Sequence, residues 1–247
     1  MITLEKVIPF DGVDPNGNLK FRSLLEIFQE MADKDASNFG LSVHQILSKG
    51  MTWVLHKYRI EFQRYPSVND GSLIIKTYAE PYGRLFSIRT FEVTNATGDL
   101  IGKAYTWWVL LDSVRLRPIR LDKCEEMAPF MNIISTSFPE EVKIENLVTP
   151  TLVEEVKVRW QELDVNNHTN HIVYFDWALD NVPDEVLTGM VPVLVECEYI
   201  HSVMKTRVKV MTQEEISNEN SRIFLHSINL ADDTLECAKL KSVWKKQ

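Results

Sequence analysis

Residues 163–180 read Leu-Asp-Val-Asn-Asn-His-Thr-Asn-His-Ile-Val-Tyr-Phe-Asp-Trp-Ala-Leu-Asp. The apolar residues in the second half of this stretch fit a buried helix face better than the alternation of a strand. Directly before that helix stand an acid, an amide and an imidazole, namely Asp164, Asn166 and His168. A helix start presents unpaired backbone N–H groups and a partial positive charge. The pattern therefore predicts a site that polarises a carbonyl while a neighbouring side chain activates an attacking group.

The same layout occurs near the beginning of the chain. Residues 14–18 read Asp-Pro-Asn-Gly-Asn and also precede apolar residues at helical spacing. Asn18 stands where His168 stands in the later copy. Two units at a fixed offset indicate an internal duplication. Because imidazole titrates near neutral pH, the copy with His168 is the candidate for chemistry. We expect the first copy to have kept the fold and lost the reaction.

These two units resemble the acyl-acyl-carrier-protein (acyl-ACP) thioesterase family, as a bacterial-type relative of the plant enzymes. The resembling stretches follow the family's order over most of residues 1–200. They are Asp14-Pro-Asn-Gly, Phe28-Gln-Glu-Met-Ala, Phe39-Gly-Leu-Ser, Trp53-Val-Leu, Tyr65-Pro, Leu85-Phe-Ser-Ile-Arg, Trp108-Val-Leu-Leu-Asp, Arg117-Pro and Leu163-Asp-Val-Asn-Asn-His-Thr-Asn-His-Ile-Val-Tyr. The resemblance implies a tandem hotdog fold, in which each unit is an antiparallel sheet wrapped around one long helix.

The pattern of the chain predicts an α+β protein. A strand at residues 2–8 and a helix at 19–38 precede strand-like runs at 52–62, 72–79, 85–94 and 101–112. A helix at 172–181 and strands at 193–200, 206–212, 222–230 and 235–243 repeat the order. Prolines interrupt the pattern between residues 115 and 150. We expect an N-terminal domain at 1–130, a linker at 131–150 and a C-terminal domain at 151–247.

Composition excludes several classes of protein. The chain has 247 residues, 45% of them hydrophobic and 25% charged, with a net charge of −8, which is typical of a soluble globular protein. The acidic balance argues against nucleic acid as a partner. We find neither a signal peptide nor an apolar stretch long enough to span a bilayer, so we expect a cytoplasmic location. The three cysteines are too scattered for disulfides or zinc, and we expect no metal or organic cofactor.

Two local basic clusters stand out against the acidic background, at residues 115–120 and 205–209. Such clusters are either a solvated face or a docking surface for an acidic carrier protein. The family resemblance makes carrier docking plausible. The sequence leaves open whether two chains form a homodimer.

Hydrolysis of a thioester needs an activated nucleophile, a group that polarises the carbonyl and a route for protons. We assign Asp164 as base or nucleophile, Asn166 as an orienting donor, and His168 as the group that binds the carbonyl or carries the proton. The resemblance implies a further glutamate on the following strand, where this chain has Ser202. Ser202 can form a hydrogen bond but cannot act as a carboxylate base. His171 either assists His168 or has a structural role.

The resemblance also implies that the first domain holds the acyl chain. Candidate lining residues are Phe28 and Met31 on the helix, and Trp53 and Trp107 on the strands. The alternative is that these side chains form an ordinary core.

The resulting hypothesis is a thioester hydrolase that releases free fatty acid from acyl-ACP in fatty acid biosynthesis. The phosphopantetheine arm arrives with the substrate. Two alternatives remain at this stage, a coenzyme A thioesterase with the same chemistry and a non-catalytic acyl-binding or regulatory hotdog protein. The length and saturation of the acyl chain are left open by the sequence.

Overall fold

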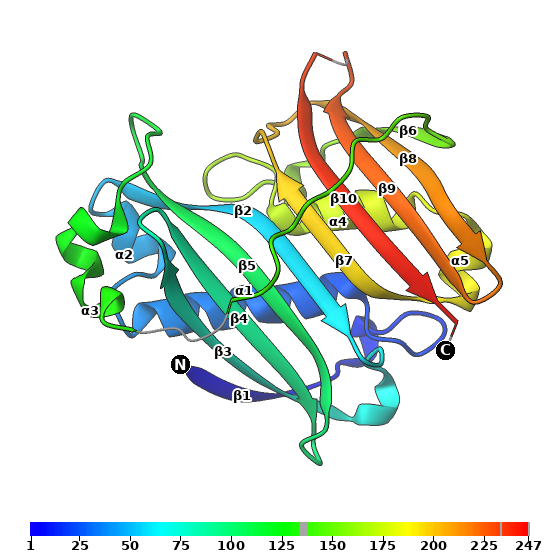
Figure 1. Cartoon of the computed structure of the whole chain (residues 1–247), viewed down its shortest axis with the longest axis horizontal. Helices are drawn as coiled ribbons and strands as arrows, with labels where there is room; N and C mark the ends of the chain where they lie inside the picture. The colour runs from blue at the N-terminus through cyan, green and yellow to red at the C-terminus, as the bar shows by residue number, and fades with distance from the viewer. Residues whose placement is uncertain (134–137, 233, 247) are drawn as a thin grey trace.

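The computed structural model describes residues 1–133, 138–232 and 234–246. Within these residues the elements, in chain order, are β1 (Ile2–Val7), α1 (Phe21–Ser37), α2 (Val43–Leu47), β2 (Met51–Phe62), β3 (Ser72–Tyr82), β4 (Phe86–Asn95), β5 (Leu100–Asp112), α3 (Ala128–Met131), β6 (Leu152–Lys157), α4 (His171–Asp180), α5 (Asp184–Gly189), β7 (Val191–Tyr199), β8 (Arg207–Asn218), β9 (Ser221–Leu230) and β10 (Glu236–Lys245) (Figure 1). The predicted α+β class is confirmed. Residues 134–137 of the predicted linker lie outside the described residues.

The strands form one antiparallel sheet in the order β1-β3-β4-β5-β2-β7-β10-β9-β8-β6. The first five strands of the chain make up one half of this sheet, and the last five make up the other. The halves meet where β2 pairs with β7, so the two units share a continuous sheet. The exact domain limits at 1–130 and 151–247 stay a prediction.

Charged side chains pair across the seam between β2 and β7. Lys57 lies opposite Glu198 in the register, with its Nζ 3.5 Å from a carboxylate oxygen, and Arg59 binds the opposite Glu196. Glu196 is buried. Cross-strand pairs of opposite charge stabilise a register, and these fix the two halves relative to each other.

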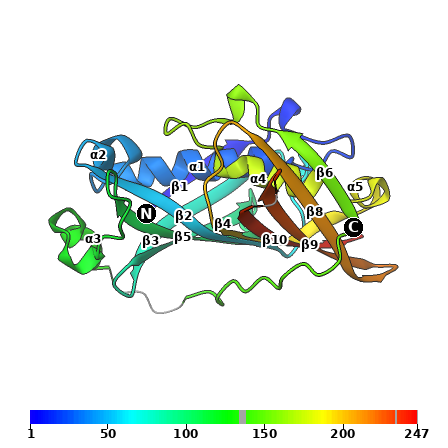
Figure 2. The same ribbon diagram turned by 90° about the horizontal axis from the view of Figure 1, so that it is seen from above.

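The two faces of the sheet are covered differently. Helices α1 and α4 lie side by side on one face, and the chain from residue 138 to β6 runs along the other (Figure 2). On that second face Lys57 Nζ donates a hydrogen bond to the carbonyl oxygen of Val142, at 3.0 Å. Val142 is fully buried against Ile88 and Trp107. The crossing segment therefore closes a small apolar cluster on the outer face of the sheet.

The internal duplication extends well beyond the polar loops. Helix α1 begins at residue 21 and α4 at residue 171, while strand β1 begins at residue 2 and β6 at residue 152. Both pairs are 150 positions apart, as are Asp14 and Asp164. One unit of strand, loop and helix has thus been used twice, once for each half of the sheet.

The two central helices bury different fractions of their surface. Helix α1 buries Leu24, Phe28, Met31 and Asp35, which recur every three or four residues and so lie on one face. Helix α4 buries seven of its ten residues, because it packs against both the sheet and α1. Among the described residues no helix combines the length and apolar character needed to cross a bilayer.

A buried polar network links the strands of the second half. His226 on β9 lies 2.9 Å from Thr212 Oγ1 through Nδ1 and 2.9 Å from Ser242 Oγ through Nε2. The indole of Trp244 also donates to Ser242 Oγ, and the amide of Asn181 donates to Thr212 Oγ1. Burial lowers the pKa of His226 to about 3. The imidazole is therefore neutral in the folded protein at any pH above that value.

This network predicts a pH-dependent stability. The unfolded chain takes up a proton at His226 near pH 6.5 and the folded chain does not, so the free energy of unfolding falls as pH drops below about 6.5. We expect His226 alone to remove about 2 kcal/mol between pH 7 and pH 5. Denaturant titrations at both pH values measure this loss, and His226→Gln should reduce it. Exposed His44 is the control. An equal reduction in His44→Gln would contradict the assignment.

Candidate active site

The loop before α4 is built around the carboxylate of Asp164. Its Oδ1 accepts hydrogen bonds from the backbone N–H groups of Asn166, at 2.8 Å, and His168, at 3.1 Å. Asn167 closes the turn with a φ of +62°, a conformation that asparagine tolerates better than most residues. The side chain of Asn166 is exposed and that of His168 is half-buried. The loop therefore holds the three residues within one turn just before α4.

The first copy has the same local geometry without the imidazole. Asp14 Oδ1 accepts from the backbone N–H groups of Asn16, at 2.8 Å, and Asn18, at 2.9 Å. Gly17 takes the turn position with a φ of +79°. Because both loops use one carboxylate oxygen in this way, building the turn is a role that Asp14 and Asp164 share. Any chemical role of Asp164 must use its other oxygen.

Ser202 follows the end of β7, next to a segment that pairs with this loop. The Thr169 N–H donates to the Val203 carbonyl oxygen at 2.7 Å, and the Val203 N–H donates to the Tyr174 hydroxyl oxygen at 3.1 Å. These bonds hold the chain around Ser202 beside the residue that follows His168. The side chain of Ser202 is exposed. The described residues give it no hydrogen bond to His168 or to any other group.

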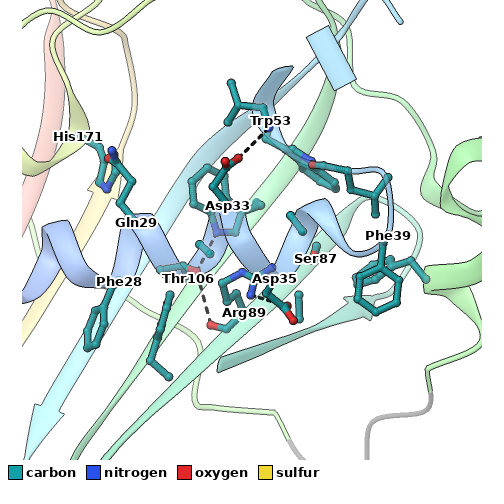
Figure 3. Close-up of a pocket in the computed structure, with 18 of the residues that line it drawn as sticks. Phe28, Gln29, Asp33, Asp35, Phe39, Trp53, Ser87, Arg89, Thr106 and His171 are labelled. Carbon is teal, nitrogen blue, oxygen red and sulfur yellow. Dashed lines mark hydrogen bonds and ion pairs between the residues drawn. The ribbon is translucent and has the colours of Figure 1, made fainter. Parts of the chain in front are cut away.

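An elongated cavity of about 120 Å³ lies between α1 and the first half of the sheet (Figure 3). Its lining is mainly apolar and aromatic. The lining residues are Phe28, Gln29, Ala32, Asp33, Asp35, Ala36, Phe39, Leu41, Val43, Trp53, Tyr58, Ala79, Ser87, Arg89, Phe91, Thr106, Trp108, Phe130 and His171. Phe28 and Phe91 stack with their ring centroids 4.3 Å apart. A long apolar slot with few polar groups suits an acyl chain.

His171 is the residue that joins the cavity to the second half. It is the first residue of α4, three positions after His168, and it lies at the end of the cavity opposite Phe39 (Figure 3). Its ring contacts those of Tyr58, Trp108 and Tyr199. Helix α1 also meets this end of α4, because Gln29 Oε1 accepts a 3.4 Å hydrogen bond from the side-chain amide of Asn170, the residue before His171.

Burial lowers the pKa of His171 to about 4. Its imidazole is therefore uncharged near neutral pH and can both donate and accept a hydrogen bond. His171 thus offers a neutral polar group where the cavity meets the loop of His168. Sequence reasoning left its role open, because only the ring contacts with Tyr58 and Trp108 of the first half reveal that it faces the cavity.

A buried ion pair interrupts the apolar lining further along the cavity. Arg89 Nη1 lies 2.8 Å from Asp35 Oδ2 and 3.2 Å from Thr77 Oγ1. The pair connects α1 with β4, and the side chains are 8% and 2% exposed. Sequence reasoning missed it, because nothing in the pattern shows that a helix aspartate and a strand arginine face each other.

Two of the four predicted acyl-binding residues line the cavity and two do not. Phe28 and Trp53 line the cavity. Met31 is fully buried in the core and does not belong to the lining. Trp107 lies on the other face of the sheet with Val142, whereas its neighbour Trp108 lines the cavity. Adjacent strand residues point to opposite faces, which is why only one of the two tryptophans reaches the cavity.

A second, more open groove of about 490 Å³ lies at the end of β6, the start of β8 and the end of β9. Lys157, Lys205 and Arg207 line it, and it includes part of the basic cluster at residues 205–209. Lys205 Nζ lies 5.3 Å from the ring centroid of Trp160, an exposed residue close before the loop. Exposed Met204 adds further apolar surface. This edge of the protein combines positive charge with exposed apolar side chains.

Cys197 is unsuited to thiolate chemistry, and the described residues contain no cluster of metal ligands. Cys197 is fully buried, and burial raises the pKa of its thiol, which disfavours the reactive thiolate. Across residues 1–133, 138–232 and 234–246, no three His, Cys, Asp or Glu side chains gather as metal ligands would. The groups available for chemistry at the loop are a carboxylate, an amide, an imidazole and a hydroxyl.

The sheet, the two central helices and the apolar cavity define a tandem hotdog protein. Two solved structures share this architecture over nearly the whole chain. An acyl-ACP thioesterase from Bacteroides thetaiotaomicron is 21% identical, with a TM-score of 0.82 over 98% of this chain and 97% of its own. The 12:0-ACP thioesterase from Umbellularia californica is 19% identical, with a TM-score of 0.87 over 100% of this chain and 94% of its own. The predicted tandem hotdog fold is confirmed.

Sequence comparison gives the family. Residues 4–127 match the acyl-ACP thioesterase N-terminal domain, and residues 145–246 match the C-terminal domain. Oleoyl-acyl carrier protein thioesterase 2, chloroplastic, from Arabidopsis thaliana is 24% identical over 94% of this chain and 73% of its own length. The chain belongs to the acyl-ACP thioesterase family, which confirms the resemblance and identifies the protein as a thioester hydrolase.

Proposed function

We propose that the protein hydrolyses a fatty acyl-ACP thioester, with the thioester at the start of α4 and the acyl chain in the cavity along α1. The observation that supports this arrangement most directly is the position of His171. It belongs to the helix that follows the Asp164 loop and lines the cavity of the other half. A substrate whose chain fills the cavity would therefore end beside the loop that holds His168.

The loop groups supply a complete hydrolysis. Water adds to the carbonyl carbon as its proton passes to the second carboxylate oxygen of Asp164. Asn166 orients the water, and the partial positive charge at the start of α4 stabilises the developing oxyanion. The C–S bond then breaks, and the proton that Asp164 took from water reaches the departing thiolate through His168, so that both side chains return to their starting state. The products are a free fatty acid and the phosphopantetheine thiol of the carrier. Ser202 beside this loop stays a prediction as the fourth catalytic residue.

We assign the basic edge around Lys205 and Trp160 to docking of the carrier protein. It adjoins the loop that we propose to be catalytic, because Trp160 precedes that loop and Val203 pairs with its end. Positive charge beside exposed apolar residues suits an acidic protein partner. The homodimer and the cytoplasmic location stay predictions of the sequence.

The thiol that carries the acyl group in the natural substrate is identified by measuring kcat/KM for one acyl group on ACP, on coenzyme A and on pantetheine alone. We expect the carrier-linked substrate to give the highest value, because only it uses the docking edge. A higher value with coenzyme A would favour the alternative function of an acyl-CoA thioesterase. Absence of hydrolysis with all three donors would favour a non-catalytic acyl-binding protein and overturn the proposal.

Charge reversal at Lys205 tests the docking edge. We expect Lys205→Glu to lower kcat/KM for acyl-ACP about tenfold at low salt, because electrostatic steering of the acidic carrier is lost. Hydrolysis of acyl-pantetheine, which lacks the carrier, should stay unchanged. Arg117→Glu is the matched control, because it makes the same charge change in the other basic cluster. A larger effect of Arg117→Glu would move the docking surface to residues 115–120.

Filling the cavity tests the acyl site. Ala32 lines the cavity from α1, and leucine keeps the helix while adding a branched side chain there. We expect Ala32→Leu to shift the preferred substrate toward shorter chains, by about 10- to 200-fold in relative kcat/KM for each methylene group that no longer fits. Competition between carrier substrates of different chain length measures the shift. Ala32→Ser, which adds little volume, should behave like the parent protein, and an unchanged profile in Ala32→Leu would place the acyl chain elsewhere.

A further inference from the structure

Arg89 presents hydrogen-bond donors to the acyl cavity. It lies in the middle of β4, is 6% exposed, and belongs to the cavity lining. A guanidinium carries five N–H donors. The two side-chain hydrogen bonds of Arg89 in the described residues both use Nη1, with Asp35 and Thr77 as acceptors. The described residues accept no hydrogen bond from Nε or Nη2, and neither atom is among the buried atoms without a partner, so both remain open to a group in the cavity.

An acyl chain made only of methylene groups would displace water from these donors and leave them unpaired, which is costly. An oxygen atom on the chain would accept from them instead. The cavity therefore discriminates against a plain hydrocarbon at this depth, and it favours a chain that carries an acceptor.

The charges around Arg89 define the kind of oxygen. Asp35 already balances the guanidinium, and Asp33 lines the same cavity. A carboxylate on the acyl chain would lie near two aspartates and only one arginine. The net negative charge would repel it, so a charged oxygen is disfavoured. A neutral oxygen, in a hydroxyl or an oxo group, avoids this repulsion.

The spacing of residues along α1 shows how far Arg89 and Asp35 lie from the His171 end of the cavity. Gln29 lies at the His171 end of the cavity, and Asp35 follows it by six residues along α1. At a rise of about 1.5 Å per residue, the ion pair lies about 9 Å further along the helix. Figure 3 shows Asp35 and Arg89 between His171 and Phe39. The oxygen would thus be on an internal or distal carbon, away from the thioester.

We propose that the substrate is an acyl chain with a hydroxyl or oxo group on an internal or distal carbon, and that Arg89 donates a hydrogen bond to this oxygen. The inference rests on the proposed function and names the substrate class of the same site. Arg89 is then a specificity-determining residue that contacts the acyl chain and takes no part in the chemical step.

The test compares acyl-ACP substrates of one chain length. One series carries a hydroxyl group on successive carbons, a second carries an oxo group on the same carbons, and the plain chain is the reference. We expect kcat/KM to peak at one position, about ten- to a hundredfold above the plain chain, the effect of one hydrogen bond to a charged group. Comparison of the hydroxyl and oxo series identifies the preferred oxygen. A flat profile, or a plain chain that is cleaved best, would overturn the inference while leaving the proposed function intact.

The double variant Asp35→Leu, Arg89→Met tests the residue itself. It replaces the pair with apolar side chains, a change that proteins often tolerate. We expect it to remove the peak and to favour the plain chain. Binding of the free hydroxy acid and the plain acid by calorimetry gives a readout independent of turnover. Tighter binding of the plain acid by the parent protein, or an unchanged preference in the double variant, would contradict the role of Arg89.

Discussion

Replacing Asp164 with asparagine is expected to lower kcat for acyl-ACP by about a hundred- to ten-thousandfold, the range typical of losing a positioned general base. Asparagine keeps an oxygen that accepts from the N–H groups of Asn166 and His168, so the loop should remain folded. The variant therefore removes the carboxylate charge and leaves the turn. Single-turnover hydrolysis of a labelled acyl-ACP measures the loss of the chemical step separately from product release.

The first copy of the loop supplies the matched control. Asp14→Asn makes the same substitution in a turn with the same pair of backbone hydrogen bonds. Because no imidazole follows it, we expect Asp14→Asn to leave turnover close to that of the parent protein. Equal losses from Asp14→Asn and Asp164→Asn would mean that the carboxylate acts only in building the turn. The catalytic assignment would then have to be abandoned.

His168→Ala separates the imidazole from the loop. The loop uses only the backbone of His168, so removal of the side chain should leave the turn intact. We expect a loss in kcat of similar size to that of Asp164→Asn, since both groups serve one proton path. Asn18→Ala is the corresponding change in the first copy.

Much of this architecture could be predicted from the sequence, because local patterns determine it. Residues 19–38 were expected to form a helix, and α1 spans Phe21–Ser37. Both polar loops were found from their composition, and their offset of 150 residues extends to the preceding strands and the following helices. Asp and Asn before an apolar run are a strong local signal, since their side chains bond to the backbone N–H groups of the turn.

Strand β6 was missed because it gives little hydrophobic signal. It lies at the edge of the sheet and pairs only with β8. Five of its six residues are exposed, so the alternation that marks a half-buried strand is absent. Its counterpart β1 was found because alternate residues are partly buried.

The cavity residues were harder to predict, because they depend on which face of the sheet each strand residue occupies. The pairing of β2 with β5 shifts between Leu55 and Lys57, so the alternation of side chains changes within β2. Trp53 and Tyr58 consequently line the same cavity although they are five positions apart. The choice between Trp107 and Trp108 depends on the same register. A sequence without its pairing partners does not contain this information.

The contact between Asp35 and Arg89 could not be predicted for a related reason, and its expected energetic effect is large. Replacing Arg89 alone with methionine should lower the free energy of unfolding by about 3–5 kcal/mol, because it leaves Asp35 buried without its main partner. The amino group of Met1 also lies 2.7 Å from Asp35 Oδ1, but it is exposed, so water screens its charge. Thr77 would lose its donor as well.

Denaturant unfolding at pH 7 measures the free energy of unfolding of three variants. It distinguishes the effect of breaking the buried ion pair from a general effect of losing an arginine. Arg89→Met should be strongly destabilised, and adding Asp35→Leu should restore most of the stability, because no buried charge then remains. Arg120→Met removes an exposed arginine that pairs with Asp122 at 2.7 Å, and it should change stability little. If Arg89→Met were as stable as Arg120→Met, the guanidinium would not be desolvated in the cavity. The donors that we assign to an oxygen on the acyl chain would then be satisfied by water, and the substrate class inferred from them would lose its physical basis.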